Sequence, residues 1–561
     1  YVLSRIAAED LTIDFVYNQE TRNLEEMRTS DGRVWKYTHT QAGVGSHAYL
    51  SRVDGPGDYV WEYEYFLDEE FPNGRRYNLS RLVTPGGASI AYNYALIHFN
   101  SFDNPVSVVS RRELTGNVQG GTWIYSYERY AETEETNVNG EAALIWMNKT
   151  TITGPSHVEA HFNMADKGEY VSSGATFFPH PLVQRVKLKE TRDGEVREYH
   201  YQFRVISNEQ YGIVNYYGQF LGAANEIVAP LLVYSRHERD GRSAAVAYTE
   251  HDQYGNPRKI TEFASVGFPD EYPPVPDVRI TTVTYSHLTD KWILALKSSE
   301  ETSGAHSISR RFDANGNLLG ETVDGVTTGF TYHQNGDLAS QIDALGNMTT
   351  YVDYYRGQAR RVEFADGSGI SLQIDRRGNV TKRIDEAGRE TGYAYDDLGR
   401  LTLQQPPSGH VTAITHGFDE TVLTRGPYRE TVGKDGFGRV VRVLKEDTQR
   451  NQDIEYRVDR DAYGRVIREY FPNSDEGKVF TYDALGRIIS TSANGILLSH
   501  YEYTADGIRH TDGNGNVTVT AFNHFGSLDG PGQVYQLDNA KGRTVIVHNL
   551  AGNVQRVYQG T

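Results

Sequence analysis

A short phrase, Asp-x-x-Gly followed by Asn or Arg, recurs through the second half of this 561-residue chain. A repeat constrains the fold strongly, because every copy must adopt one local structure and pack against its neighbours. Some copies lie 10 or 11 residues apart, and others lie at about two or three times that spacing. The copies begin at Asp252, Asp313, Asp343, Asp375, Asp385, Asp396, Asp435, Asp461, Asp483 and Asp512, with degenerate copies at Asn523 and Asn549.

Each position of the phrase has a mechanical explanation. The short Asp side chain can accept hydrogen bonds from backbone amides two residues on, which makes an Asx-type turn. The Gly supplies a positive φ that a Cβ atom would penalise. The segments that follow alternate polar and apolar residues, as in "GRVIREYF" and "NVTVTAF". The repeat therefore predicts a turn plus a strand, copied into a continuous antiparallel ribbon.

The first half repeats more loosely. A Gly-containing turn enters a strand with alternate aromatic residues in five segments: "DGRVWKYTH", "DGPGDYVWEYEY", "PGGASIAYNY", "GGTWIYSYERY" and "DGEVREYHYQF". We therefore divide the chain into residues 1–245, an irregular β-repeat region, and residues 246–561, the regular one. The Pro-rich segment 268–277 is interpreted as a loop that leaves the sheet, with a linker between domains as the alternative.

Helical signals are scarce, since no stretch of 12 or more residues shows an apolar period near 3.6. Even the apolar beginning at Ile6 reads as a strand after Asp10. Gly 55 and Tyr 39 are both high counts, which fits many tight turns and half-buried strands. The expected fold class is all-β.

Charge and composition exclude several classes of partner. A net charge of −18 argues against nucleic acid or an anionic membrane as the main partner. No cysteine is present, so disulfides and thiolate metal sites are excluded. No apolar run approaches the roughly 20 residues that span a bilayer. The chain begins at Tyr1 without an apolar leader, so we expect it to be an excerpt of a longer protein.

A long ribbon has unpaired edges, which promote aggregation unless the sheet closes, spirals or is covered. A ribbon that spirals on itself places each turn of the spiral beside the next. With large curvature, it would enclose a space. The predicted architecture is therefore a long antiparallel ribbon spiralling into a large hollow shell.

Two copies carry a family resemblance. "YDDLGRL", from Tyr395, and "YDALGRI", from Tyr482, resemble the YD repeat of the rearrangement-hotspot (Rhs) family. That family includes shell components of bacterial toxin complexes, polymorphic toxins and animal teneurins. The resemblance implies a hollow β-shell, and in bacterial members a shell that encloses a C-terminal toxic domain.

The resemblance also implies partners and a location. The partners would be a C-terminal toxin cargo, neighbouring shell segments of the parent protein, and a secretion or translocation component, with no nucleic acid and no membrane span. The protein would be secreted or at the cell surface, delivered from a bacterium. The family's Pro- and Asp-rich self-cleaving core is not visible here, so no cleaving aspartate is carried over.

The sharpest candidate for chemistry is "SHVEAHF", which contains His157, Glu159 and His161. On a strand these residues share one face, where two imidazoles and a carboxylate could bind zinc or another divalent metal. No further ligand stands out downstream, and no HExxH motif is present. An exposed polar strand face is the plainer interpretation, so no metal residue is assigned.

Other motifs are weaker. The segment from Asp313 to Glu321 and the one from Asp512 to Asn516 faintly resemble calcium loops, but their Gly is fourth rather than sixth. No phosphate-binding glycine motif or nucleophile elbow occurs in a suitable context. No catalytic or cofactor-binding residue is assigned, and no cofactor is expected.

Aromatic residues alternate at Trp61, Tyr63 and Tyr65, so several rings share one strand face. They are either part of the sheet core or a surface that binds sugar or an unfolded peptide.

Three functional hypotheses follow. The leading one is a non-enzymatic shell segment that encapsulates a toxic effector. The second is a cell-surface module that binds glycans or a protein. The third is a carbohydrate-active lyase or hydrolase on a repeat scaffold, with His157 and His161 as the residues to mutate.

Overall fold

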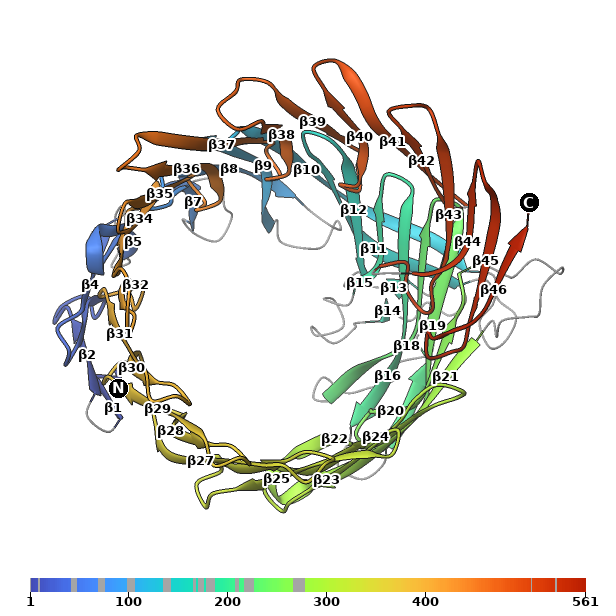
Figure 1. Cartoon of the computed structure of the whole chain (residues 1–561). Coiled ribbons are helices and arrows are strands. Elements are labelled where there is room, and N and C mark those ends of the chain that lie inside the picture. Colours follow the sequence, from blue (N-terminus) through green and yellow to red (C-terminus); the bar gives the residue numbers. More distant parts are fainter. Residues whose placement is uncertain are drawn as a thin grey trace. The chain divides into compact units, whose positions relative to one another are not determined.

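The computed structural model describes most of the chain (Figure 1). The described residues are 2–8, 11–41, 48–68, 76–97, 106–134, 143–164, 168–169, 176–177, 187–206, 211–215, 227–265, 278–505, 507–529 and 532–560. The Pro-rich segment 268–277, interpreted above as a loop, lies outside them.

The fold is all-β, as predicted. Across the described residues there is no α-helix, and the helical elements there are two 3₁₀ turns, η1 (Pro56–Asp58) and η3 (Thr289–Lys291). No helix in this part of the chain has the length and apolar character needed to cross a membrane. The segment after Asp10 is a strand, as expected from its sequence.

The chain forms two compact units, and each of them is made of three segments of the chain. Unit 1 comprises Tyr1–Ile97, Asn104–Ile124 and Gly329–Phe480, and unit 2 comprises His98–Asp103, Tyr125–Thr328 and Thr481–Thr561. We call the residues of a unit that precede 329 its first pass and those from 329 onward its second pass. The division near residue 245 concerned the regularity of the repeat and stays a prediction.

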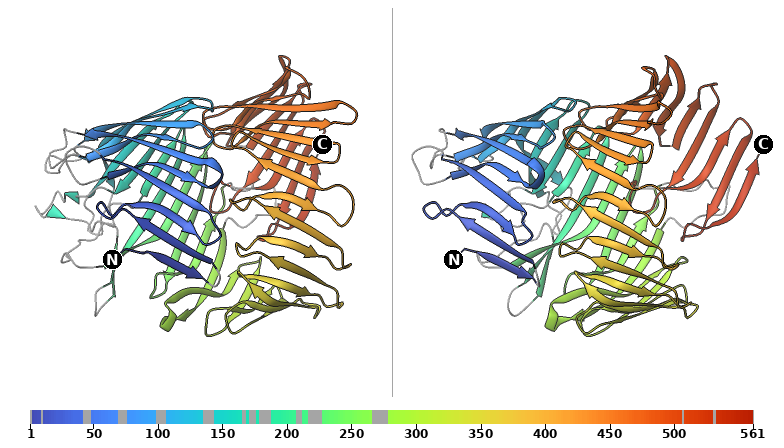
Figure 2. Two further views of the ribbon diagram at one scale, coloured as in Figure 1. Left: turned by 90° about the vertical axis from the view of Figure 1, so that its left-hand side faces the viewer. Right: turned by 60° about the vertical axis from the view of Figure 1, so that its left-hand side comes forward.

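The strands of unit 1 follow one another as successive rungs (Figure 2). Its first pass contains β1 (Arg5–Ala8), β2 (Leu11–Tyr17), β3 (Leu24–Thr29), β4 (Val34–Gln41), β5 (Ala48–Gly55), β6 (Tyr59–Asp68), β7 (Arg76–Val83), β8 (Ala88–Ile97) and β9 (Val106–Gly116). Its second pass contains β26 (Leu338–Ile342), β27 (Met348–Tyr355), β28 (Gln358–Glu363), β29 (Gly369–Ile374), β30 (Val380–Ile384), β31 (Glu390–Tyr395), β32 (Leu401–Gln405), β33 (Thr412–His416), β34 (Glu420–Arg425), β35 (Tyr428–Lys434), β36 (Val440–Asp447), β37 (Gln452–Arg460) and β38 (Val466–Tyr470).

Unit 2 is built in the same way. Its first pass contains β11 (Ala143–Thr153), β12 (Val158–Met164), β13 (Gly168–Glu169), β14 (Thr176–Phe177), β15 (Lys187–Arg192), β16 (Glu195–Ile206), β17 (Tyr211–Asn215), β18 (Ile227–Arg239), β19 (Arg242–His251), β20 (Pro257–Phe263), β21 (Val278–Leu288), β22 (Ile293–Thr302), β23 (Ser307–Phe312) and β24 (Leu318–Val323). Its second pass contains β40 (Ile488–Ala493), β41 (Ile496–Thr504), β42 (Gly507–Asp512), β43 (Val517–Asn523), β44 (Gln533–Asn539), β45 (Gly542–His548) and β46 (Val554–Gly560). The chain crosses from one unit to the other within β10 (Gly121–Glu134), β25 (Val326–Tyr332) and β39 (Gly477–Tyr482).

Strands that are neighbours in sequence pair antiparallel, as in β29–β30 and β31–β32. The ladder register shifts by one residue just before a repeat Asp, between Gln373 and Ile374 and again between Ala394 and Tyr395. The extra residue lies on the strand after the turn, at Thr381 and at Thr402, so each shift is a β-bulge beside the turn that contains the repeat Gly. Each repeat therefore connects two strands by the same bulged hairpin.

In each unit, turns of the second pass contact hairpins of the first pass, and we call this boundary the seam. Buried side chains such as Ala88 and Thr84 lie there. In unit 1, Ala88 has no exposed surface and Thr84 donates a hydrogen bond from Oγ1 to the Gly436 carbonyl, at 2.8 Å. A Cβ atom on Gly436 would lie 2.5 Å from the Ala88 nitrogen, so only glycine fits this approach. The rings of Trp123 and Tyr463 meet edge to face across the same seam, at 5.6 Å.

The repeat glycine can be tested at Gly388, whose φ is 75° and whose Cβ would meet no atom within 4 Å. Gly388→Ala should lower the free energy of unfolding by about 1 kcal/mol, because the cost is purely one of backbone conformation. Urea titration followed by circular dichroism measures it. Gly392→Ala is the control, since Gly392 lies in β31 outside the left-handed region and its nearest neighbour would be 3.6 Å away. An equal loss in both variants would contradict the prediction.

Candidate functional site

The repeat Asp organises its own turn. In the copy at Asp396, Oδ1 accepts the backbone N–H groups of Leu398 and Arg400, at 3.0 and 2.9 Å. Oδ2 accepts Nε of Arg400 at 2.7 Å. This confirms the predicted Asx-type turn. It also explains why the fifth position is either Asn or Arg, because each has a side-chain N–H that donates to the Asp carboxylate of its own turn.

These bonds favour the charged form of Asp385 and Asp396. The backbone N–H of Arg389 is the largest cause that lowers the pKa of Asp385, and its guanidinium adds to the effect. At Asp396, burial alone would raise the pKa, but the backbone and side chain of Arg400 bring it below its ordinary value. Such carboxylates are turn-formers, as proposed from the sequence for Asp483.

Tyr395 of the repeat and the strand residue Tyr503 have partners that sequence reasoning missed. Tyr395 Oη donates to the carbonyl of Val380 at 2.9 Å, and Tyr503 Oη donates to that of Ile488 at 3.0 Å. Each acceptor is the first residue of the strand that follows an earlier repeat turn. In both pairs the tyrosine lies 15 residues after its acceptor in the sequence. This constant separation was the sequence signal that could have predicted the hydrogen bond.

The two loops that resembled calcium sites are ordinary repeat turns. Asp313 Oδ1 accepts the N–H groups of Asn315 and Asn317, and its Oδ2 accepts Nδ2 of Asn317. Asp512 makes the same three bonds with Asn514 and Asn516. Because these acceptors already bind the turn, the geometry does not resemble a calcium loop.

The His-Glu-His group does lie on one face at the start of β12. His157 Nε2 is 3.9 Å from one oxygen of Glu159, and His161 Nε2 is 3.6 Å from the other. Residues four apart on a strand are separated by about 13 Å, so the two imidazoles flank the carboxylate from opposite sides. This spacing does not suit a single ion shared by all three.

Glu190 of β15 extends this group. One of its oxygens is 3.7 Å from His161 Nδ1, while Lys187 Nζ lies 2.7 Å away and Tyr199 Oη donates at 3.1 Å. Burial would raise the pKa of Glu190, but Lys187 lowers it below its ordinary value. A polar pocket of about 150 Å³ lies here. Its lining residues are Glu159, His161, Glu190, Thr191, Arg192, Glu195 and Arg197.

The aromatic row at Trp61, Tyr63 and Tyr65 belongs to β6. Burial raises the pKa of Tyr63 and of Tyr65, and the Tyr65 ring packs 5.3 Å from Tyr49 of β5. These contacts favour packing on the sheet over the interpretation as an open binding surface.

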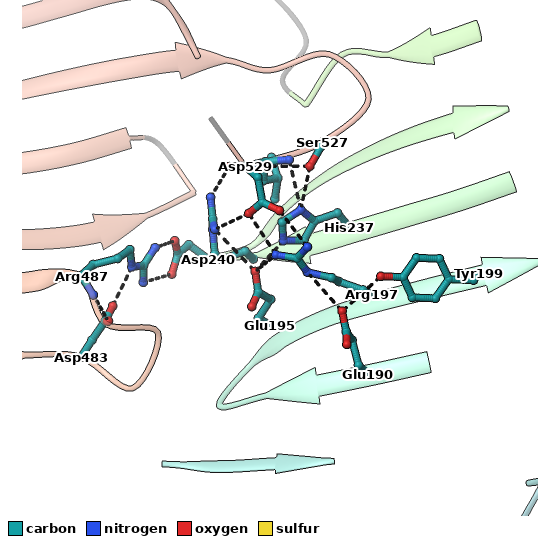
Figure 3. A network of polar contacts seen from close by, with 12 residues as sticks. Glu190, Glu195, Arg197, Tyr199, His237, Asp240, Asp483, Arg487, Ser527 and Asp529 are labelled. Carbon is teal, nitrogen blue, oxygen red and sulfur yellow. Dashed lines mark hydrogen bonds and ion pairs between the residues drawn. The ribbon is translucent and has the colours of Figure 1, made fainter. Parts of the chain in front are cut away.

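A dense polar cluster at the seam of unit 2 joins the pocket (Figure 3). Arg197 binds Asp529 at 2.7 Å and Glu195 at 3.1 Å, and Arg239 lies 3.5 Å from both carboxylates. His237 Nε2 is 2.6 Å from Glu195. We call Glu195, Arg197, His237, Arg239 and Asp529 the clasp, because the first four belong to the first pass and Asp529 belongs to the second.

The clasp is the one group of three potential metal ligands in the described residues whose donor atoms lie within 4.8 Å of one another, through Glu195, His237 and Asp529. Two guanidinium groups already lie against these carboxylates. A divalent cation would be repelled by them, so the cluster suits an ion-pair network better than a metal site.

The Glu195 carboxylate of the clasp stays charged near neutral pH. Burial would raise the pKa of Glu195, but the hydrogen bond with His237 and the charge of Arg197 lower it to about 2. A carboxylate with a lowered pKa in the fold stabilises it at neutral pH. That contribution falls off only as pH drops from the ordinary value of 4.5 toward about 2.

A second seam contact in unit 2 uses a repeat arginine. Arg487 binds Asp483 of its own turn through Nε at 2.6 Å, and its terminal nitrogens bind both oxygens of Asp240 in the first pass. Its guanidinium also lies over the Tyr503 ring, 3.9 Å from the centroid. Figure 3 shows this bidentate pair beside the clasp.

Unit 1 repeats this arrangement. Arg377 Nε binds Asp31 at 2.6 Å, across 346 residues of sequence. Burial would raise the pKa of Asp31, but its bonds with Thr29, Arg33 and Arg377 lower it well below its ordinary value. In both units, an Asp of a first-pass hairpin thus accepts an arginine of a second-pass repeat turn.

Comparisons with known proteins agree with this geometry. The sequence profile of the RHS Repeat family matches residues 375–411. The chain is 33% identical over 156 residues to the probable deoxyribonuclease RhsA of Dickeya dadantii, a match that covers 27% of this chain and 10% of that protein. It is 30% identical over 125 residues to the double-stranded DNA deaminase toxin A of Burkholderia cenocepacia, covering 18% and 9%.

A solved structure shares the fold. The Tc holotoxin pore of Photorhabdus luminescens matches with a TM-score of 0.59 at 10% identity, over 99% of this chain and 42% of that chain. The chain thus corresponds to less than half of that structure, and its matches span about a tenth of the curated relatives. The phrase that recurs here matches the RHS repeat at residues 375–411, and the chain is similar to proteins of the Rhs/YD-repeat family.

The seam role of the repeat arginine can be isolated with two variants. Arg487 and Arg389 each bind the Asp of their own turn, at 2.6 and 2.8 Å, but only Arg487 also holds Asp240. Arg487→Ala should cost about 2 kcal/mol of unfolding free energy, because it leaves Asp240 half-buried without its partner. Arg389→Ala should cost at most about 0.5 kcal/mol, because Arg389 is 68% exposed. Equal losses in urea titrations would refute a seam role for Arg487.

Proposed function

We propose that this chain is a non-enzymatic wall segment of an Rhs shell that encapsulates a toxic effector for delivery. The observation that carries the proposal is the seam. A ribbon whose turns meet turns 346 and 352 residues further along has returned on itself. Side-by-side passes cover each other's hairpin turns, so a thin sheet can form a continuous wall without a thick core.

The order of the passes supports the same proposal. Apart from residues 98–103, the chain runs through unit 1, unit 2, unit 1 and unit 2 again. Within each unit, first-pass residues thus contact residues 247 or 346 positions further along, as is expected of a ribbon that returns along itself. The fold shared with a toxin-complex pore is consistent with a shell, and so are the half-buried strands, which supply too little core for a solid particle.

The nature of the cargo is inferred from the relatives. The printed names of two of them are those of a deaminase toxin and a probable deoxyribonuclease. A toxic domain of this kind would be the partner enclosed by the wall, together with neighbouring shell segments of the parent protein. Delivery from a bacterium, through a secretion or translocation component, belongs to the same proposal.

A second candidate is recognition of a glycan or protein at a surface, and Trp292 favours it. This side chain is 80% exposed at the tip of the β21–β22 hairpin and has a positive φ of 56°. An exposed aromatic residue in a left-handed conformation is unusual and is often a recognition residue. The carbohydrate-active enzyme, the third hypothesis, stays untested.

The encapsulation proposal is tested on the full-length parent protein. Electron cryomicroscopy should show a hollow particle with density inside its wall. Deleting the toxic domain should remove the internal density and leave the wall unchanged, because the wall is held by its own seams. A solid or flat particle, or internal density that survives the deletion, would refute encapsulation.

The second candidate has its own test. A glycan array probed with this chain should give no specific signal if it is only a wall. A signal that disappears in Trp292→Ala, and persists in the control Leu345→Ala at another exposed turn, would favour surface recognition. Leu345 is a suitable control because it is 88% exposed and aliphatic.

A further inference from the structure

The clasp holds one segment of the second pass, residues 523–529, against the first pass of unit 2. Ser265 N–H donates to the His524 carbonyl at 2.8 Å, and Gly526 N–H donates to that of Phe263 at 3.1 Å. The segment ends at Leu528, which is 1% exposed, and at Asp529, which binds Arg197. We call residues 523–529 the clasp segment.

His237 holds the far end of the clasp segment in a defined protonation state. The backbone N–H of Leu528 points at His237 Nδ1, at 3.1 Å. Because an N–H group is a donor, Nδ1 must be the acceptor and carries no proton. The ring proton therefore lies on Nε2, which donates to Glu195 at 2.6 Å. Only a neutral imidazole satisfies both contacts, and its side chain is 6% exposed.

We propose that His237 is an acid-sensitive latch, in which uptake of a proton at Nδ1 releases Leu528 and frees the clasp segment from the first pass. A protonated Nδ1 becomes a donor and cannot accept the Leu528 N–H. Histidine is the side chain that ordinarily changes charge in mildly acidic solution. The inference goes beyond encapsulation, since it concerns how the seam opens and needs no cargo.

Four charged groups surround the His237 ring. Glu195 and Arg197 face it from β16, Arg239 from β18 and Asp529 from the clasp segment. Two carboxylates are thus opposed by two guanidiniums, and Arg197 binds both carboxylates. Each of these carboxylates therefore has a guanidinium partner, and the contact that depends on the proton at Nδ1 is the hydrogen bond from the Leu528 N–H.

One other acceptor lies near the ring. Ser527 Oγ is 3.4 Å from the same Nδ1. The Leu528 N–H and Ser527 Oγ both approach His237 Nδ1. A protonated Nδ1 can therefore donate to Ser527 Oγ only if the Leu528 N–H moves away. That movement is the opening that the latch requires.

The direction of the pH dependence follows from proton counting. The clasped form lacks the proton at Nδ1 that the open form can bind, so acid favours the open form. Glu195, with its pKa lowered to about 2, stays charged in mild acid and does not contribute. In a shell wall, this latch would loosen the seam of unit 2 in an acidic surrounding.

Hydrogen exchange of the Leu528 amide tests the latch in the intact chain. Between pH 7.5 and pH 5.5, after correction for intrinsic exchange, its protection should fall by about 10- to 100-fold, the range open to one proton over two pH units. The Gly486 amide, which bonds to Asp483 inside a repeat turn, should stay protected at both pH values. Unchanged protection of Leu528 would overturn the proposal.

Three variants separate the latch from general acid sensitivity. His237→Asn places an acceptor near Nδ1 but cannot be protonated, so Leu528 should stay protected at both pH values. His237→Gln lacks that acceptor, so Leu528 should exchange rapidly at both. A pH response retained in His237→Asn would assign the acid sensitivity to another group and overturn the proposal.

His287→Asn is the matched control. His287 Nδ1 faces the Leu294 carbonyl at 2.9 Å, and its Nε2 faces Asp252 at 3.2 Å. Both neighbours are acceptors, so a doubly protonated ring is satisfied there. The pH response of Leu528 should be the same in this variant as in the wild type. A loss of that response would show that it does not belong to His237.

Discussion

Everything in this protein depends on one short hydrogen-bonded turn, in which an aspartate carboxylate accepts backbone amides two and four residues ahead. In the copy at Asp396, the carboxylate also holds the arginine of its own turn. The turn makes each hairpin nearly independent of its neighbours. A ribbon of any length can therefore be built without a thick hydrophobic core.

Such a ribbon is thin, and its stability must come from elsewhere. The seam supplies part of it, because there the turns of a second pass cover the hairpins of a first pass. The contacts are mixed in character. Thr84 and Gly436 meet through a hydroxyl-to-carbonyl hydrogen bond, Trp123 and Tyr463 through rings, and Arg487 and Asp240 through charge. The arginine that closes its own turn thus also joins distant parts of the chain.

The polar side chains of this protein have two different roles. The repeat aspartates and the clasp carboxylates are bound by amides or guanidiniums, so they hold structure together. The histidine of the clasp differs, because its contact with Leu528 requires one protonation state. A wall assembled from self-contained turns can change at one such point without losing the hairpins on either side.

The sequence by itself determined the local structure. The Asp and Gly of the repeat, and the alternation after them, were enough to predict turns, strands, an all-β class and the family, because those properties arise within about ten residues. The pairing of Arg487 with Asp240 and of His237 with Leu528 was decided only by the tertiary structure. These partners lie 247 and 291 residues apart, and no local periodicity reports which hairpin turn will meet another. The same limit applied to His157, Glu159 and His161: their shared face was predictable, but the distances that argue against a common ion depended on the strand that carries them.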